Sequence, residues 1–368
     1  MHGNIKVAEV IISCNKILSY KTIYNTKLLP YGTFTTNKLL EHSLINNWHD
    51  SRSIPAKRQN LERIINVLGY TPADGFMQSL GVSLTDQFWI KDKSSNLTWE
   101  DVNFYDNEFS SIFLLASQNI QSSGFSPDFT TDGMLEKFWI SSMNEPILIK
   151  FDSMYNNLLA ANEVVVFHIA QELGIKTTPY FQYKIQDRLA CACPCYIKDK
   201  YTDYVNAMQI RHMHIGEPGF KLVDFMDKNM NLKSDLDNIR ILDILIHNED
   251  RHEKNIGVSI QNYDLNTAEL IPAFDNGSCL GYNRCSNNTI SKDNMKFFGK
   301  KREDVVKDIT IIPNIDLNKI KQIIIDIYQL YNISNERLKY ALDEVEYGYY
   351  ILENERNLRL ESEMDYEK

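Results

Sequence analysis

The stretch DILIHNEDRHEKN, Asp243 to Asn255, passes from apolar residues into a dense run of carboxylate, imidazole and amide side chains. Ile239 to Ile246 predicts a buried helix, and Ile256 to Ile260 predicts a short strand after the polar residues. Loops held between two regular elements often carry reactive side chains. The sequence therefore predicts a functional loop between this helix and this strand.

A second acidic segment, FDNG at Phe274 to Gly277, follows an apolar run further along the chain. It places an acid at a predicted strand end, before a glycine that lets the chain turn. Phosphoryl transfer from a nucleotide needs Mg²⁺ bound by carboxylate or amide oxygens and a carboxylate that faces the attacking hydroxyl. On this interpretation Asp250 faces the hydroxyl, and Asn255 and Asp275 bind the metal.

Residues 120–197 have the pattern of a small, mostly β lobe with one helix, Leu158 to Leu173, that ends at Gly174. Its strands are expected at Lys137 to Ile140, Pro146 to Phe151, Tyr180 to Ile185 and Leu189 to Ile197. Beyond residue 200 the pattern is mainly helical. It has a strand at Leu270 to Ala273 and helices at Leu317 to Tyr331 and Asn335 to Glu361. This combination predicts an α+β fold with two lobes.

The predicted β lobe contains residues suited to binding a nucleotide. Lys150 ends an apolar strand, where a lysine can contact phosphates as a point charge. Glu163 in the following helix is placed to pair with it. The polar loop 122–137 ends in Gly133 to Lys137, and its backbone N–H groups are suited to covering phosphates.

Each feature has a simpler explanation when it is taken alone. Asp250, Arg251 and Glu253 resemble an ordinary surface salt-bridge cluster, and a single lysine–glutamate pair usually has a structural role. The order along the chain favours catalysis. A polar loop, a strand lysine, a helix glutamate, an acidic loop and a strand-end acid follow one another as a kinase requires.

The segment Asp243 to Asn255 resembles the catalytic loop of the HipA-like serine/threonine kinases. Asp275 to Gly277 resembles the metal-binding motif of that family, and Gly133 to Lys137 resembles the end of its glycine-rich loop. The resemblance covers residues 120–320. It implies a protein-kinase-like fold with a small, mostly β N-lobe and a helical C-lobe.

The resemblance also implies roles for individual residues, with ATP and Mg²⁺ as cofactors. Asp250 becomes the catalytic base or the group that orients the hydroxyl, and Lys150 the phosphate lysine. Asn255 and Asp275 become the metal ligands. His252 is expected to be structural. The expected activity is transfer of the γ-phosphoryl group to a protein serine or threonine.

The remaining nucleotide-binding residues implied by the resemblance are Gly133, Lys137 and Glu163. Family members can phosphorylate a serine in their own glycine-rich loop. At that place this chain has Thr130 and Thr131, with serines at 122, 123 and 126 nearby. Some family members are toxins with a DNA-binding antitoxin, so an antitoxin-like protein partner is a further expectation.

The expected domains are an N-terminal accessory region at 1–118, a kinase N-lobe at 119–199 and a helical C-lobe at 200–368. In the accessory region, Asn37 to Trp48 and Lys57 to Leu68 predict helices, and Val82 to Ile90 predicts a strand.

The composition restricts the possible function classes. The 368 residues include 49 acidic and 39 basic side chains, for a net charge of −10. This balance argues against direct nucleic-acid binding and against a membrane-surface protein. We expect no membrane span, because no stretch of about 18 uncharged apolar residues exists. Six cysteines without a dense framework, and no signal-peptide pattern, predict a reduced, cytoplasmic setting.

Two alternatives stay open at this point. A lipid or a small molecule would serve as the phosphoryl acceptor with the same chemistry. A non-catalytic nucleotide-binding module would use its accessory region to bind a partner protein.

Overall fold

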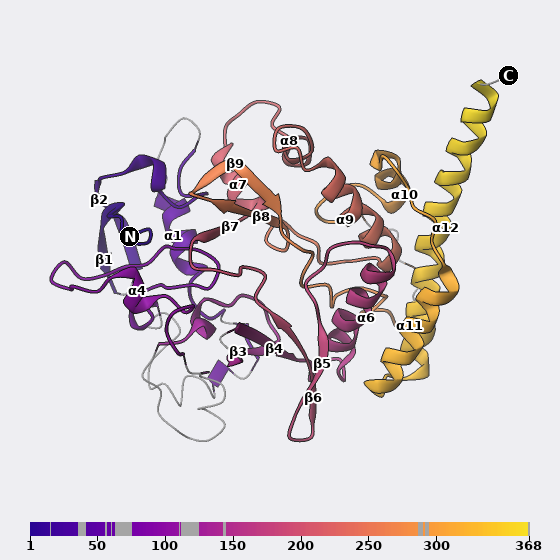
Figure 1. Cartoon of the computed structure of the whole chain (residues 1–368), viewed down its shortest axis with the longest axis horizontal. Coiled ribbons are helices and arrows are strands. Elements are labelled where there is room, and N and C mark those ends of the chain that lie inside the picture. The colour runs from indigo at the N-terminus through magenta and orange to yellow at the C-terminus, as the bar shows by residue number, and fades with distance from the viewer. Residues whose placement is uncertain are drawn as a thin grey trace. The chain divides into compact units, whose positions relative to one another are not determined.

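The computed structural model describes residues 1–14, 16–35, 42–55, 57–59, 61–62, 76–109, 111, 125–142, 145–285, 290 and 294–366. The chain forms two compact units. The first unit comprises Met1–Lys150, Cys193–Leu222 and Gly257–Glu269. The second comprises Phe151–Ala192, Val223–Ile256 and Leu270–Lys368. Figure 1 labels the elements of both units, from β1 to the long C-terminal helix α12.

The first unit holds all or most of the following elements: β1 (Ala8–Ser13), β2 (Lys16–Ile23), η1 (Thr26–Leu28), α1 (His42–Asp50), α4 (Trp99–Val102), η2 (Pro127–Thr130), β3 (Glu136–Ser142), β4 (Glu145–Phe151), β7 (Thr202–Asn206), α7 (Ala207–Met213), β8 (Gly257–Gln261) and β9 (Asp264–Leu270). The second unit holds all or most of these: α6 (Leu158–Glu172), β5 (Phe181–Ile185), β6 (Arg188–Pro194), α8 (Leu222–Lys228), α9 (Lys233–Ile246), α10 (Arg302–Val305), η3 (Val306–Asp308), α11 (Leu317–Leu330) and α12 (Asn335–Tyr366).

Three sheets are formed, with strand orders β1-β2, β3-β4-β6-β5 and β7-β8-β9. The four strands predicted between residues 137 and 197 are confirmed as β3, β4, β5 and β6. β5 and β6 pair antiparallel from Phe181↔Ala192 to Ile185↔Arg188. Gln186 between them adopts the left-handed conformation, with φ of 54°, which allows a tight reversal.

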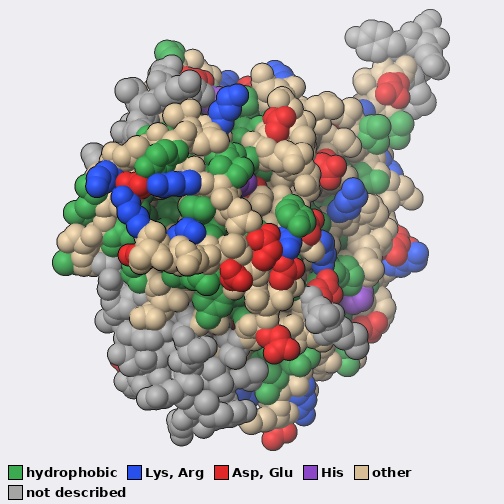
Figure 2. Space-filling model, turned by 60° about the vertical axis from the view of Figure 1, so that its left-hand side comes forward, with side chains coloured by type: hydrophobic (Ala, Val, Ile, Leu, Met, Phe, Trp, Pro, Cys, Tyr) green, Lys and Arg blue, Asp and Glu red, His purple; other side chains and the backbone are tan. Residues whose placement is uncertain are grey.

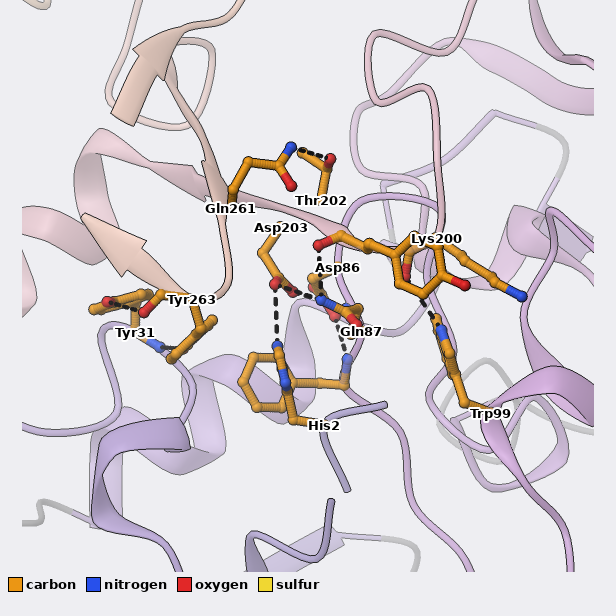
Figure 3. Close-up of polar contacts among 12 residues, drawn as sticks. His2, Tyr31, Asp86, Gln87, Trp99, Lys200, Thr202, Asp203, Gln261 and Tyr263 are labelled. Atoms are coloured by element: carbon orange, nitrogen blue, oxygen red, sulfur yellow. Dashed lines mark hydrogen bonds and ion pairs between the residues drawn. The ribbon is translucent and has the colours of Figure 1, made fainter. Parts of the chain in front are cut away.

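In the first unit, the N-terminal residues are tied to the β7-β8-β9 sheet by buried polar contacts (Figure 3). Asp203 in β7 accepts hydrogen bonds from His2 Nε2 at 3.0 Å and from the backbone N–H of Gln87 at 2.9 Å. Tyr263 OH accepts a hydrogen bond from the backbone N–H of Tyr31, and the two rings stack 4.5 Å apart. These strands belong to the first unit together with residues 1–118. The expected domain boundaries at 118 and 199 stay predictions.

The expected strand at Val82 to Ile90 is wrong. Only Phe88 forms an isolated bridge, with His2. Side chains instead accept two of its backbone N–H groups: Asp203 accepts that of Gln87, and Asp86 accepts that of Phe88, each at 2.9 Å. Among the expected N-terminal helices, α1 confirms the described part of the first, and most of Lys57 to Leu68 lies outside the described residues.

In the second unit, the helices predicted from apolar periodicity are confirmed as α6, α9, α11 and α12. α6 is buried on almost all sides along its first half, and it ends where Gly174 takes a φ of 69°. Each fully buried aliphatic side chain in these helices stabilises the fold by about 1.5–3 kcal/mol. The expected strand at Leu270 to Ala273 is wrong: β9 ends at Leu270, and Ala273 forms a single parallel bridge with Thr177.

Four of the six cysteines are buried, and all six are free thiols. Cys14 and Cys285 are the two exposed ones, and they belong to the first and the second unit respectively.

Among the described residues, no helix is both long and apolar enough to cross a membrane. The face in Figure 2 carries a group of basic side chains toward its left edge, and basic and acidic side chains are interspersed over the rest of it, so this view shows no continuous basic surface.

Candidate functional site

Arg251 joins the predicted functional loop to the acidic segment that follows Ala273. Its guanidinium is buried and donates to both carboxylate oxygens of Asp243 in α9, each at 3.1 Å. Nη1 donates to the carbonyl oxygens of Asn255 at 3.2 Å and of Phe274 at 2.8 Å. Nη2 donates to Oδ1 of Asn276. The guanidinium of Arg251 is therefore hydrogen-bonded to both the loop 250–255 and the segment 274–276, and it keeps these two segments close together.

Burial and charge act against each other in this pair. Burial lowers the pKa of the Arg251 guanidinium, but the Asp243 carboxylate outweighs it, so the pKa of Arg251 is raised overall. Arg251 is therefore a permanently charged cation inside the second unit. A planar guanidinium suits this place because it donates a parallel pair of hydrogen bonds to Asp243 and has further N–H groups for other acceptors.

Asp250 has a fixed backbone and a partly exposed carboxylate. Its N–H donates to Oδ1 of Asn248 at 2.9 Å, and its carbonyl accepts the N–H of His252 at 2.8 Å and Nδ2 of Asn255 at 3.0 Å. Its Oδ1 accepts from Nζ of Lys296 at 2.8 Å. The carboxylate is thus presented on a rigid turn at the surface, as a group that receives a proton from an acceptor hydroxyl must be.

The expected metal ligands carry oxygen atoms of the type that Mg²⁺ prefers. Because Nδ2 of Asn255 donates to the Asp250 carbonyl, its Oδ1 points elsewhere, and no described residue donates a hydrogen bond to that oxygen. Asp275 adopts a φ of 55°, and its N–H lies 3.4 Å from the hydroxyl of Tyr180. In the part of the chain that is described, no cluster of three His, Cys, Asp or Glu side chains could bind a metal alone. One amide and one carboxylate oxygen are donors of the kind that a magnesium ion uses when water and phosphate complete its ligands.

Glu163 in α6 reaches the same segment from the other side. It is buried, and its Oε2 accepts the backbone N–H of Asn276 at 2.8 Å. The neighbouring Asn162 donates to the carbonyl oxygens of Gly277 at 2.9 Å and Cys279 at 3.0 Å. A Cβ at Gly277 would lie 2.8 Å from the backbone oxygen of Leu159. The segment after Asp275 is therefore fixed directly on α6, and the pairing of Glu163 with Lys150 stays a prediction.

The other expected nucleotide-binding residues belong to the first unit. Lys150 is buried in β4, and Lys137 is buried in β3. Gly133 has a φ of 103°, and a Cβ there would collide with Nζ of Lys137. The lysine therefore packs against a glycine that adopts a left-handed conformation, and substitution of this glycine would displace the ammonium.

The threonines near this glycine differ in how their hydroxyls are used. Thr131 donates to the carbonyl of Pro127 at 2.9 Å and accepts from Nε1 of Trp139 at 2.8 Å. Thr130 donates to Pro127 at 3.2 Å. Ser126 is buried, and the serines at 122 and 123 lie outside the described residues.

The sequence reasoning missed three contributors. Arg251 has no role of its own in the sequence-based interpretation, although an arginine five residues after a buried apolar helix that contains Asp243 was an available signal. Asn162 gave no signal, because it lies within an apolar helix. Lys296 also gave no signal in the sequence, because it reaches Asp250 only through the turn formed by residues 294–300. His252 is partly exposed, and its Nδ1 accepts the N–H of Lys254 at 3.2 Å, which agrees with a role in holding the loop.

No protein-family model matches the chain, and no curated protein matches it in sequence. Among solved structures, one similar chain comes from the complex of HipA, HipB and operator DNA, a toxin–antitoxin system of Shewanella oneidensis MR-1. The match has a TM-score of 0.55 and 12% identity, and it covers 97% of this chain and 98% of that one. The chain has the fold of HipA.

This finding confirms the predicted kinase-like α+β fold class, and the HipA likeness extends over nearly the whole chain. A second similar structure is the proinflammatory kinase CtkA of Helicobacter pylori, with a TM-score of 0.49 and 19% identity. That match covers 63% of this chain and 98% of CtkA.

Proposed function

We propose that this chain is an ATP- and Mg²⁺-dependent kinase that transfers the γ-phosphoryl group to a serine or threonine hydroxyl of a protein. The observation that supports the proposal is the network of Arg251. In a HipA-like fold, it holds the loop that carries Asp250 and Asn255 beside the segment that carries Asp275. Three oxygen-bearing side chains with different tasks are thereby kept in one region of the second unit.

Magnesium-bound ATP supplies the electrophilic phosphorus and most of the charge neutralisation in such a reaction. The Asp250 carboxylate orients the acceptor hydroxyl and receives its proton as the new oxygen–phosphorus bond forms and the bond to the β-phosphate oxygen breaks. Oδ1 of Asn255 and the carboxylate of Asp275 hold the metal. Lys150 is assigned to the phosphates, together with Lys137 and the backbone around Gly133.

Self-phosphorylation near the glycine-rich loop is part of the proposal, with Thr130 as the preferred acceptor. Thr131 is the poorer acceptor because its hydroxyl both donates to Pro127 and accepts from Trp139. A phosphate here would add about −1.5 to −2 charge close to the nucleotide phosphates and oppose binding. Mass spectrometry after incubation with Mg-ATP tests this idea, and no phosphate on residues 122–131 would reject it.

A protein partner is also proposed. The HipA structure contains HipB and operator DNA, and the fold likeness includes the N-terminal residues of this chain. We expect an antitoxin-like protein to bind the chain without the chain itself contacting nucleic acid. Affinity purification from the source cells, with the purified complex tested for DNA binding before and after the partner is removed, checks both parts.

The central experiment uses γ-labelled ATP with Asp250→Asn and Asp275→Asn. Asp187→Asn is the matched control, because Asp187 is fully exposed and, among the described residues, its side chain pairs only with Lys184. We expect the wild type and the control to label protein, and each site variant to lose transfer by at least about 100-fold. Urea unfolding shows whether the variants remain folded.

Parallel assays offer casein, phosphoinositide vesicles or no acceptor. Transfer to protein supports the proposal, whereas transfer only to lipid would replace it with a lipid kinase. Nucleotide binding without any transfer would identify a non-catalytic module. Full activity in both site variants would overturn the assignment of the residues.

A further inference from the structure

Residues 294–300 form a tight turn that presents a lysine to Asp250. Met295 and Lys300 make an isolated antiparallel bridge, in which the N–H of Met295 donates to the carbonyl of Lys300 at 2.8 Å. The N–H of Gly299 donates back to the Met295 carbonyl at 2.8 Å, and Gly299 takes a φ of 65°. The backbone of the turn is therefore closed on itself.

Buried side chains on either side fix the direction of Lys296. Met295 and Phe297 are buried, whereas Lys296 between them is exposed. The ring of Phe298 lies under the guanidinium of Arg240, 5.1 Å away, and Arg240 is itself held by Asp227 and Asp237. Because the turn is anchored by its apolar residues, the lysine between them extends outward on a fixed base.

The ammonium of Lys296 forms an ion pair with the carboxylate of Asp250, which in the proposed function orients the acceptor hydroxyl. Nζ lies 2.8 Å from Oδ1 of Asp250, and His252 Nε2 lies 4.0 Å from Oδ2. Both partners are partly exposed, with side-chain exposures of 55% for Lys296 and 37% for Asp250. Exposed ion pairs contribute only about 0–1 kcal/mol to stability, so folding alone does not account for this anchored arrangement.

We propose that Lys296 is a positioning residue for phosphoryl transfer, an inference that rests on the proposed function. Its ammonium holds one oxygen of Asp250 and leaves the other to face the acceptor hydroxyl. It also offsets the negative charge of Asp250, which must lie close to a triphosphate during the reaction. An unpaired carboxylate at this place would repel the nucleotide and would rotate freely about its side-chain bonds.

The test compares Lys296→Met, Lys296→Arg and Lys300→Met by initial rates with Mg-ATP, measured as labelled protein and as released phosphate. Lys300 is the matched control, because it lies in the same turn with similar exposure but pairs with Asp308 at 2.7 Å. We expect Lys296→Met to lower kcat by about 10- to 100-fold with little change in KM for ATP, as misorientation of a reacting group does. Lys296→Arg should recover most of the rate, and Lys300→Met should match the wild type.

Urea unfolding should give the same stability for all four proteins within about 1 kcal/mol. Asp250→Asn combined with Lys296→Met should be no slower than Asp250→Asn alone, since the lysine acts through the carboxylate. If the wild type is active, Asp250→Asn is inactive and Lys296→Met transfers phosphate at the wild-type rate, this inference is overturned and the proposed function stays intact. A wild type without any transfer would overturn the proposed function, and this inference with it.

Discussion

Glu163 and Asn276 are joined by a hydrogen bond of 2.8 Å from the backbone N–H of Asn276 to the buried carboxylate of Glu163. The bond links α6 to the residue that follows Asp275, the proposed metal ligand. The position of that aspartate therefore depends on α6 as well as on the loop itself.

Replacing Glu163 tests this link. Glu163→Ala leaves the buried N–H of Asn276 without an acceptor and should lower the free energy of unfolding by about 1–3 kcal/mol. Glu163→Gln keeps an acceptor oxygen and should cost less. Glu172→Ala on the same helix removes only an exposed pair with Lys319 and should cost less than about 1 kcal/mol. Urea unfolding followed by circular dichroism measures all three, and equal losses in the two alanine variants would contradict the link.

Arg251→Lys examines the guanidinium network. Lysine keeps the positive charge, but it cannot donate in parallel to Asp243 while also reaching Phe274 and Asn276. Because partners of a buried charge are left unsatisfied, we expect a loss of about 3 kcal/mol or more in unfolding free energy.

Arg356→Lys is the comparison for this variant, since Arg356 forms a partly exposed pair with Glu353. It should unfold at nearly the wild-type urea concentration. If Arg251→Lys were also indistinguishable from the wild type, the network would not be what holds the two segments together.

At Gly348, α12 lies close against the backbone of α9. A Cβ there would collide with the backbone oxygens of Ile244 and Leu245. Alanine normally favours a helix over glycine by about 1 kcal/mol, but the collision should outweigh this gain, with a net loss of about 1–3 kcal/mol. Tyr350→Ala alters an exposed position in the same helix and should be nearly neutral. A more stable Gly348→Ala protein in thermal unfolding would show that the two helices can separate freely.

Protonation of Glu344 in α12 should lower the stability of the folded protein in acid. Burial raises the pKa of its carboxyl group, but His247 at 3.3 Å and Arg302 at 3.1 Å outweigh burial, so the pKa is lowered overall. A lowered pKa in the folded state contributes stability above the unfolded value, about 4.3. That contribution is lost as the pH falls through the lower, folded-state pKa.

Unfolding free energies measured between neutral and strongly acidic pH should therefore fall more steeply in the wild type than in Glu344→Gln. The comparison uses the slope against pH, so any overall cost of the substitution does not affect it. Identical slopes in the two proteins would show that Glu344 titrates in the folded protein as it does in the unfolded chain.

The sequence predicted those parts of the fold in which local pattern and burial agree. α6 and α9 have long apolar runs with clear ends, and β3 to β6 have apolar strands of ordinary length. The segment Val82 to Ile90 alternates only weakly, and the side chains of Asp203 and Asp86 accept the N–H groups of Gln87 and Phe88. Periodicity shows neither the local turn made by Asp86 nor the contact with the distant Asp203.

In the candidate site, too, some residues could be selected from the sequence and others could not. Asp250, Asn255 and Asp275 could be selected because they lie in short polar runs next to apolar elements. Arg251 could not be selected because side chains in charged runs are usually solvated, whereas this one turns inward to Asp243. Lys296 reaches Asp250 only through the turn that Met295 and Phe297 anchor, and a turn of that kind has no signature in the local sequence.

The placement of the thiols has a practical consequence. Cys14 and Cys285 are the accessible ones, and each unit carries one of them. Native protein treated with a maleimide dye should thus receive one fluorophore per unit without any engineered cysteine. Energy transfer between a donor and an acceptor attached in this way would follow the separation of the units in real time as nucleotide is added.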